Sequence, residues 1–230
     1  MSQETLVEDI TGLFQVWVAG WAGCRGYRTS TEGRFPAVLR ADTSGDWEVF
    51  ASEPTPEEFA ALAAKTAEAP ARVLTVLTHD PARFTALAAK HGLNVTSDSQ
   101  TMMIVDMETQ DAEDPWLSDD DLSLSTFEQD GVHYAEVRSG ADIAASGRVF
   151  VVGDTAVFDK IITEPAFQRR GLGSFIMRAL AAQAFGHDVR TGLLLASADG
   201  QKLYSHLGWT TVARVLMISA SHDGADLSLS

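Results

Sequence analysis

The sequence has few cations for its size. Its 230 residues contain 17 Lys and Arg against 32 Asp and Glu, a formal net charge of −15. Binding to nucleic-acid phosphates or to an anionic membrane surface needs clustered cations, so we expect neither partner. An acidic protein attracts a cationic substrate such as an amine, although solubility explains the acidity at least as well.

The sequence also lacks thiols, metal-binding patterns and long apolar runs. Its single cysteine, Cys24, excludes an intrachain disulfide and a thiolate metal cluster. The six histidines contain no His-x-x-x-His pair, so we expect no metal. The first residues carry no cationic segment followed by an apolar one, and no apolar run is long enough to span a membrane. These absences predict a cytoplasmic protein without a signal peptide.

Apolar periodicity predicts alternating helices and strands in both halves of the chain. Predicted turn residues, such as Thr43-Ser44-Gly45, and predicted caps, such as Thr55 and Asp80, set the boundaries. The predicted helices cover residues 4–24, 56–69, 81–92, 174–185 and 199–207. The predicted strands cover residues 36–42, 46–52, 72–78, 101–107, 131–140, 141–154, 156–165, 192–197 and 210–220.

An acidic stretch with Pro115 divides the chain. We interpret residues 1–107 as an N-terminal α/β domain, residues 108–123 as a linker and residues 124–230 as a C-terminal domain. Each half ends in a strand, a helix with a terminal glycine and a further strand. This order indicates either a repeated domain or the ordinary alternation of any α+β chain.

One segment carries a chemical signal: Gln168-Arg169-Arg170-Gly171-Leu172-Gly173-Ser174, which joins an apolar strand to a helix. The first turn of a helix has backbone N–H groups without partners in the helix, and the helix dipole is positive there. Gly171 and Gly173 lack the Cβ atom that would hold an anion away from this backbone. The segment predicts a pyrophosphate site; the alternative is a strand–helix turn that binds nothing.

The segment resembles the acetyl-CoA loop of the GCN5-related N-acetyltransferase (GNAT) superfamily, whose pattern is Gln/Arg-x-x-Gly-x-Gly/Ala. Further along, Leu203-Tyr204-Ser205-His206-Leu207-Gly208-Trp209 resembles the family's Leu-Tyr-x-x-x-Gly-Phe, with Trp in place of Phe. Ser197 and Gly200 stand where the family often has Asn and Ala. The resemblance covers about residues 125–220.

The resemblance implies an α/β (α+β) fold with a GNAT-like mixed, mostly antiparallel sheet flanked by helices. If the N-terminal half is a degenerate copy without the phosphate loop, the chain holds two such domains in tandem. The resemblance also implies acetyl-CoA as co-substrate and no metal, with the strand before the loop holding the pantetheine arm. The implied cofactor-binding residues are Ile161, Ile162, Thr163, Gln168, Arg169, Arg170, Gly171, Leu172, Gly173, Ser174 and Ser197. For Ser197 the alternative is a helix cap.

The resemblance further implies a catalytic role for Tyr204, which matches the general acid that protonates the departing CoA thiolate. The alternative is a core aromatic. A general base is expected because most amines are protonated at neutral pH. Asp159 is the first candidate and Glu164 and His206 are the next; a solvent-facing carboxylate beside Lys160 is the alternative for Asp159.

We therefore expect an N-acetyltransferase that acts on a primary amine of a small molecule by direct attack. Cys24, in an apolar stripe, is a poor covalent nucleophile. Trp17, Trp21 and Tyr27 could line the acceptor pocket, although such aromatic residues are more often core. A non-catalytic acyl-CoA sensor, an interaction module with a vestigial loop, and transfer of another acyl group stay open. A homodimer is compatible with the sequence.

Overall fold

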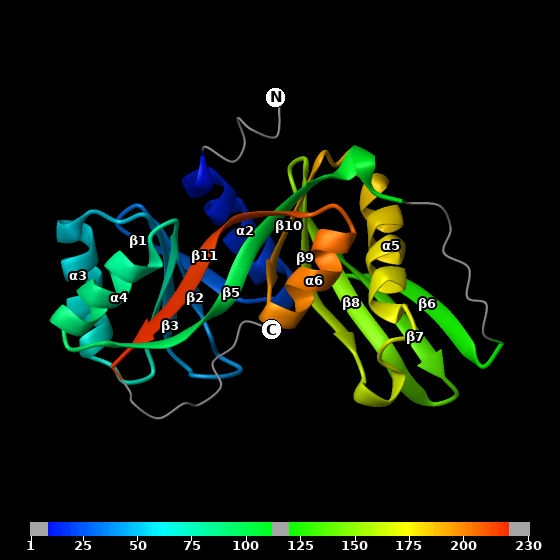
Figure 1. The fold of residues 1–230 in the computed structure, drawn as a ribbon, viewed down its shortest axis with the longest axis horizontal. Coiled ribbons are helices and arrows are strands. Elements are labelled where there is room, and N and C mark those ends of the chain that lie inside the picture. Colours follow the sequence, from blue (N-terminus) through cyan, green and yellow to red (C-terminus); the bar gives the residue numbers. More distant parts are fainter. Residues whose placement is uncertain (1–8, 112–119, 221–230) are drawn as a thin grey trace.

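One mixed sheet runs through the molecule. A computed structural model describes residues 9–111 and 120–220. Within them, eleven strands pair in the order β1-β2-β3-β4-β11-β5-β10-β9-β8-β7-β6, from one end of the molecule to the other (Figure 1). Neighbouring strands are antiparallel except in the pairs β3–β4 and β9–β10. The predicted mixed, mostly antiparallel sheet flanked by helices is confirmed.

Apart from an unpredicted strand at residues 28–32, the strands and α-helices of the N-terminal half follow the predicted order. The helix that begins at Pro56 has the predicted cap: Thr55 Oγ1 accepts a hydrogen bond from Glu58 N at 3.2 Å, and the Glu58 carboxylate accepts one from Thr55 N at 2.9 Å. The elements are α2 (Ile10–Arg25), β1 (Arg28–Glu32), β2 (Phe35–Leu39), β3 (Trp47–Ser52), α3 (Pro56–Ala67), β4 (Val73–Thr78), α4 (Pro81–Lys90), β5 (Asn94–Asp106) and the 3₁₀ helix η1 (Met107–Thr109).

Apart from an unpredicted strand at residues 122–129, the strands and α-helices of the C-terminal half also follow the predicted order. Its elements are β6 (Leu122–Gln129), β7 (Val132–Ser139), β8 (Asp142–Val152), β9 (Thr155–Thr163), the 3₁₀ helix η2 (Pro165–Phe167), α5 (Leu172–Phe185), β10 (Thr191–Ala196), α6 (Ala198–His206) and β11 (Thr210–Ser219). Parts of three predicted segments lie outside the described residues: the start of the first helix, the centre of the linker and the C-terminal tail. No helix in the two described ranges is both long and apolar enough to cross a membrane.

The sequence patterns missed two strands, β1 and β6. Both lie at the outer edges of the sheet, and most of their residues are exposed. An edge strand with little buried surface needs no apolar alternation, so periodicity gave no signal for either strand. The end of the predicted linker is the beginning of β6.

Each half places its last strand inside the other half. β5 pairs with β10 and β11 pairs with β4, and the two exchanged strands pair with each other. Figure 1 shows β5 and β11 side by side in the middle of the sheet. In both halves a helix joins two parallel strands and a second helix leads to the exchanged strand. The halves therefore share one order of elements and one continuous sheet.

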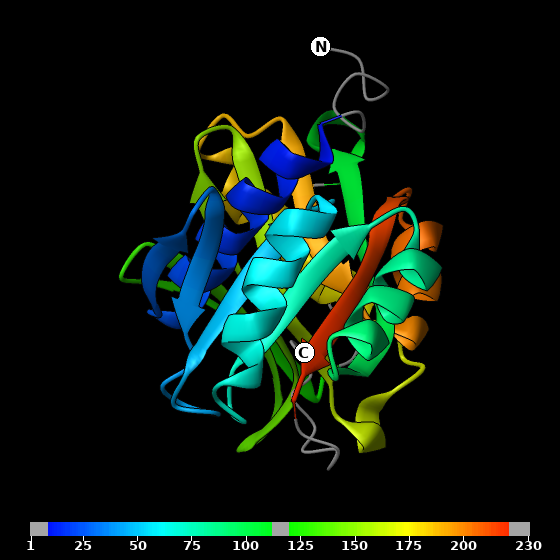
Figure 2. The same cartoon turned by 90° about the vertical axis from the view of Figure 1, so that its left-hand side faces the viewer.

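Helices α2 and α5 cover opposite faces of the C-terminal strands. A Cβ atom added at Gly23 of α2 would lie 2.8 Å from the ring of Phe150, and one at Gly20 would collide with Val157. On the other face, a Cβ at Gly147 would lie 2.7 Å from Ile176 of α5. The glycines that weaken helix propensity thus allow α2 to pack directly on the sheet. In Figure 2 α2 and α6 lie on opposite sides of the strands.

Candidate active site

Strands β9 and β10 separate beyond their first residues. They pair over Thr191–Leu193 and Thr155–Val157. β9 then carries an extra residue at Lys160, where φ is +51° and the register with β8 shifts. A cavity of about 680 Å³ lies at this separation. The corresponding strands of the N-terminal half, β3 and β4, stay paired over Glu48–Ser52 and Val73–Leu77.

The glycine loop forms one wall of the cavity, at the start of α5. Gly171 is the N-cap residue and has φ +78°, a conformation that favours glycine. No side chain of the described residues caps this helix, and a Cβ added at Gly171 would meet nothing within 4 Å. A Cβ at Gly173 would lie 3.0 Å from Leu203, so glycine there allows α6 to approach α5. The first-turn amides are therefore open to an anion.

The structure gathers most of the predicted cofactor-binding residues around the cavity. Those that line it are Ile161, Ile162, Thr163, Gln168, Arg169, Gly171, Leu172, Gly173, Ser174 and Ser197. Arg170 does not line the cavity; its guanidinium lies over the ring of Phe167, 5.5 Å from the centroid. Ser197 is also the N-cap of α6, where its Oγ accepts a hydrogen bond from Gly200 N at 3.2 Å. The helix-cap role weighed for Ser197 is confirmed.

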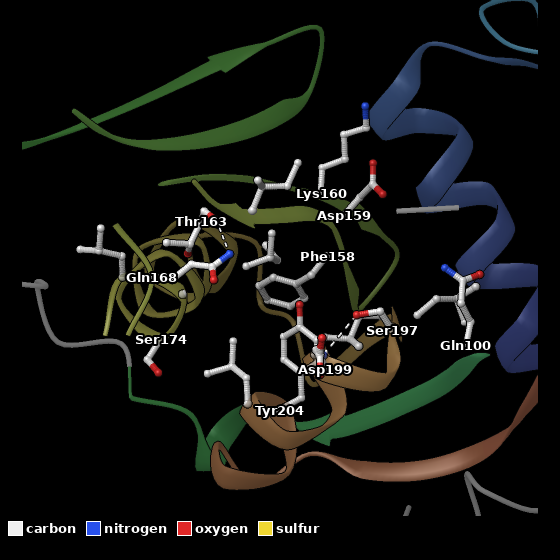
Figure 3. A pocket seen from close by; sticks show the side chains of 18 of the residues that line it. Gln100, Phe158, Asp159, Lys160, Thr163, Gln168, Ser174, Ser197, Asp199 and Tyr204 are labelled. Atoms are coloured by element: carbon white, nitrogen blue, oxygen red, sulfur yellow. Dashed lines mark hydrogen bonds between the residues drawn. The ribbon is translucent and has the colours of Figure 1, made fainter. Parts of the chain in front are cut away.

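Tyr204 lies on α6 in the cavity wall (Figure 3). Its ring packs against Trp209, with 6.0 Å between centroids, so Trp209 supports Tyr204 from the core. A Cβ at Gly200 would lie 3.1 Å from the Tyr204 ring, so glycine leaves that ring more room than alanine would. Burial, followed by the negative charge of Asp159, raises the pKa of Tyr204 to about 12. The phenol therefore keeps its proton at neutral pH.

Asp159 lines the cavity, but both of its carboxylate oxygens already accept hydrogen bonds. Arg25 donates at 3.0 and 2.8 Å, and Arg148 donates at 2.9 and 2.6 Å. Asp159 is only 7% exposed, so the solvent-facing alternative is wrong. To take a proton from an amine, the carboxylate would have to give up bonds to two guanidinium groups. The geometry therefore argues against the role of general base that the sequence analysis considered for Asp159.

The comparisons with known proteins agree with this geometry. Residues 129–211 match the family model described as acetyltransferase (GNAT) domain. This matched segment, the GNAT domain, includes the glycine loop and Tyr204. A search of the curated proteins finds no match to the sequence.

Solved structures extend the likeness beyond the GNAT domain. A GCN5-related N-acetyltransferase from Kribbella flavida covers 94% of this chain and 97% of its own, with TM-score 0.67 and 14% identity. A putative GNAT-family acetyltransferase from Novosphingobium aromaticivorans covers 84% and 91%, with TM-score 0.55 and 15% identity. A tandem GNAT protein from the clavulanic acid biosynthesis pathway covers 82% and 79%, with TM-score 0.57 and 13% identity. At these identities the likeness is one of fold, and it extends over the N-terminal half as well.

The other predicted base candidates lie outside this cavity. Glu164 is exposed at the end of β9 and is not among the lining residues. His206, near the end of α6, lines a second hollow of about 350 Å³ together with Gly171 and Ser174. The GNAT domain thus brings Tyr204 and the glycine loop to one cavity but adds neither Glu164 nor His206 to its wall.

From the described part of the N-terminal half, two residues line the cavity, Trp17 and Gln100. Of the three aromatic residues weighed for an acceptor pocket, Trp17 lines the cavity, whereas Trp21 is fully buried and Tyr27 donates a hydrogen bond to Asp42 at 2.6 Å. No local pattern pointed to Gln100, because β5 reaches the GNAT domain only through the exchange of strands.

Proposed function

We propose that the GNAT domain transfers an acetyl group from acetyl-CoA to a primary amine of a small molecule by direct attack in a ternary complex. The observation that supports this proposal is that one cavity joins an open helix start, the separated edge of β9 and the buried phenol of Tyr204. These features suit a diphosphate, an extended arm and a reacting thioester, in that order.

The cofactor would lie along the loop and β9. The amides of residues 168–174 would bind the pyrophosphate, because the first turn of α5 has no side-chain cap in the described residues. Ile162 and Thr163 pair with β8 on one side and lie beyond the last β9–β10 pair on the other. Their edge towards β10 is therefore open to a pantetheine arm, except that the Thr163 carbonyl accepts a hydrogen bond from Gln168 Nε2 at 3.4 Å.

Tyr204 would act on the departing thiolate as a hydrogen-bond donor. The pKa of about 12 keeps the phenol protonated at neutral pH. Because a thiol has a pKa of about 8.5, complete proton transfer from Tyr204 to the CoA sulfur is unfavourable in this environment. Donation of a hydrogen bond to the developing negative charge needs no such transfer and suits the observed burial.

The amine would lose its proton without help from Asp159. Asp159 is held by two arginines, and its charge contributes to the raised pKa of Tyr204. We therefore assign Asp159 to positioning and assign the loss of the amine proton to water. Turnover should then rise with pH up to the pKa of the amine, because only the neutral amine attacks.

A covalent acyl-cysteine route finds no support at Cys24. Its side chain is buried, and its Sγ donates a long hydrogen bond to the Val157 carbonyl at 3.8 Å. Burial, followed by the charge of Asp159, raises the pKa of the Cys24 thiol well above its usual range. A thiolate nucleophile is therefore absent at neutral pH, which favours direct attack by the amine.

Two measurements test the proposal. A thermal-shift titration with CoA, acetyl-CoA and longer acyl-CoA esters should show stabilisation by the ligands that the site accepts. Amine-dependent release of free thiol from acetyl-CoA should then follow, and Tyr204→Phe should lower turnover on the order of a hundredfold while CoA affinity stays the same. Binding of acyl-CoA without thiol release for any amine would instead indicate a sensor, and no binding would reject the proposal.

A further inference from the structure

Gln100 has an unpartnered polar group in the wall of the active-site cavity. The residue is only 4% exposed, and its Oε1 atom has no hydrogen-bond partner. Within the described residues, the other buried side-chain polar atoms without a partner belong to Trp21, Arg40, Arg72, Thr101 and Trp209, none of which lines the cavity. A buried amide oxygen without a partner destabilises a folded protein, so its place beside an empty space points to a ligand.

The backbone places Gln100 where the sheet opens. On one side β5 pairs with β10 as far as the pair Thr101–Ala196, the last residue of β10. On the other side Gln100 still pairs with Val215 of β11. Gln100 is thus the first residue of β5 beyond the end of β10, at the point where the cavity passes between the strands. Figure 3 shows its side chain between α2 and the labelled residues of β9.

An apolar wall from the same half accompanies this amide. Trp17 lines the cavity and is fixed by its neighbours: its ring stacks on Phe14 and Trp21, with centroid distances of 5.9 and 5.5 Å. The aromatic stack leaves Trp17 little freedom to move. A rigid aromatic face and one uncharged polar group therefore border the cavity from the N-terminal half.

The described residues that the N-terminal half places in the cavity wall, Trp17 and Gln100, carry no charge. This wall therefore offers no ion-pair partner to an ionised group of the acceptor. The Gln100 carboxamide can rotate by half a turn about its last bond, so it can present either its oxygen or its NH₂ group to the cavity. Both ends match an uncharged partner such as a hydroxyl or an amide.

We propose that Gln100 recognises an uncharged hydrogen-bonding group on the acceptor and that Trp17 packs against the acceptor's apolar body. The acceptor class is then a primary amine with an aromatic or aliphatic body that carries a hydroxyl or carboxamide. This inference rests on the proposed function and deepens it. It makes the N-terminal half, through an exchanged strand and α2, the part of the chain that selects the substrate of the GNAT domain.

The test compares pairs of amines that differ by one polar group. Tyramine and 2-phenylethylamine differ by one hydroxyl, and further pairs are aliphatic amines with and without a carboxamide. Binding to the CoA-saturated protein is measured by calorimetry, and KM is measured where thiol release occurs. We expect wild-type protein to prefer the polar member of at least one pair. Gln100→Leu should remove that preference, weakening binding of the polar member on the order of tenfold, the equivalent of one hydrogen bond.

Thr101→Val is the matched control, because Thr101 Oγ1 is equally buried and unpartnered but lies outside the cavity wall. Both variants remove an unpartnered polar atom, so both should keep or raise the Tm, whereas only Gln100→Leu should change amine selection. CoA affinity should be unchanged in both. If wild-type protein shows no preference within any pair, or if Thr101→Val changes selection as much as Gln100→Leu, the inference is overturned. If wild-type protein does not bind CoA at all, that result would instead reject the proposed function.

Discussion

The carboxylate of Asp159 on β9 accepts two hydrogen bonds from the guanidinium of Arg25 on α2, at 3.0 and 2.8 Å. The pair joins the GNAT domain to the N-terminal half, and both side chains are 6% exposed. Arg148 of β8 donates to the same carboxylate from within the GNAT domain. Asp159 therefore holds two cationic side chains beside the active-site cavity.

Replacing Asp159 should first affect stability. Asp159→Asn removes the negative charge that the poorly exposed guanidinium groups of Arg25 and Arg148 share. We expect the free energy of unfolding to fall by about 3 kcal/mol, as for other broken buried ion pairs. Urea denaturation measures this change, with Asp142→Asn, an exposed carboxylate in the same sheet, as the control. A variant that keeps wild-type stability but loses turnover would restore Asp159 as the candidate base.

Tyr204 should titrate far above neutral pH. Its pKa in the folded protein is about 12, above the value of about 10 for an unfolded chain. Its contribution to stability is therefore complete below about pH 10 and is lost as the pH rises through about 12. Spectrophotometric titration of the 3 tyrosines should show a step near pH 12 that is missing in Tyr204→Phe. If Tyr204 instead titrates at the ordinary pKa of a phenol, that result would contradict its buried position.

Gly171 should matter for CoA and not merely for the turn. Gly171→Ala forces alanine to adopt φ +78°, which should cost about 1 kcal/mol of stability, and it places a methyl group in the open space at the start of α5, where we propose that the pyrophosphate binds. Gly153→Ala, in the β8–β9 turn, carries the same conformational cost at φ +61°, with open space around the new Cβ. Thermal-shift titration with CoA should show weaker binding for Gly171→Ala alone. Equal affinity in the two variants would remove the loop from the binding site.

The two halves should not fold independently. Because β5 lies between β10 and β11, a chain cut in the segment 108–123 leaves each fragment without a central strand. We expect either fragment alone to aggregate or remain unfolded, and the two together to restore the CoA-binding protein. Circular dichroism and size-exclusion chromatography of the separate and mixed fragments check this. A soluble, CoA-binding fragment of residues 124–230 would show that the exchanged strand is dispensable.

The sequence determined the local features of this protein. Apolar periodicity placed the helices and most inner strands, and residue chemistry placed the cap at Thr55 and the open helix start at Gly171. These features depend on neighbours a few residues apart, so spacing alone reveals them. The edge strands β1 and β6 escaped because exposed strands need no apolar pattern.

Only the tertiary structure decided how the halves combine. The exchange of β5 and β11 depends on pairing between strands more than a hundred residues apart along the chain, which no local spacing encodes. That exchange brought Gln100 to the cavity. Packing of α2 on the sheet likewise joined Arg25 to Asp159. The carboxylate that the sequence suggested as a base thus has two fixed arginine partners, Arg25 and Arg148. Residue type sets what a side chain can do, but its charged and polar neighbours, which long-range packing selects, set what it is free to do.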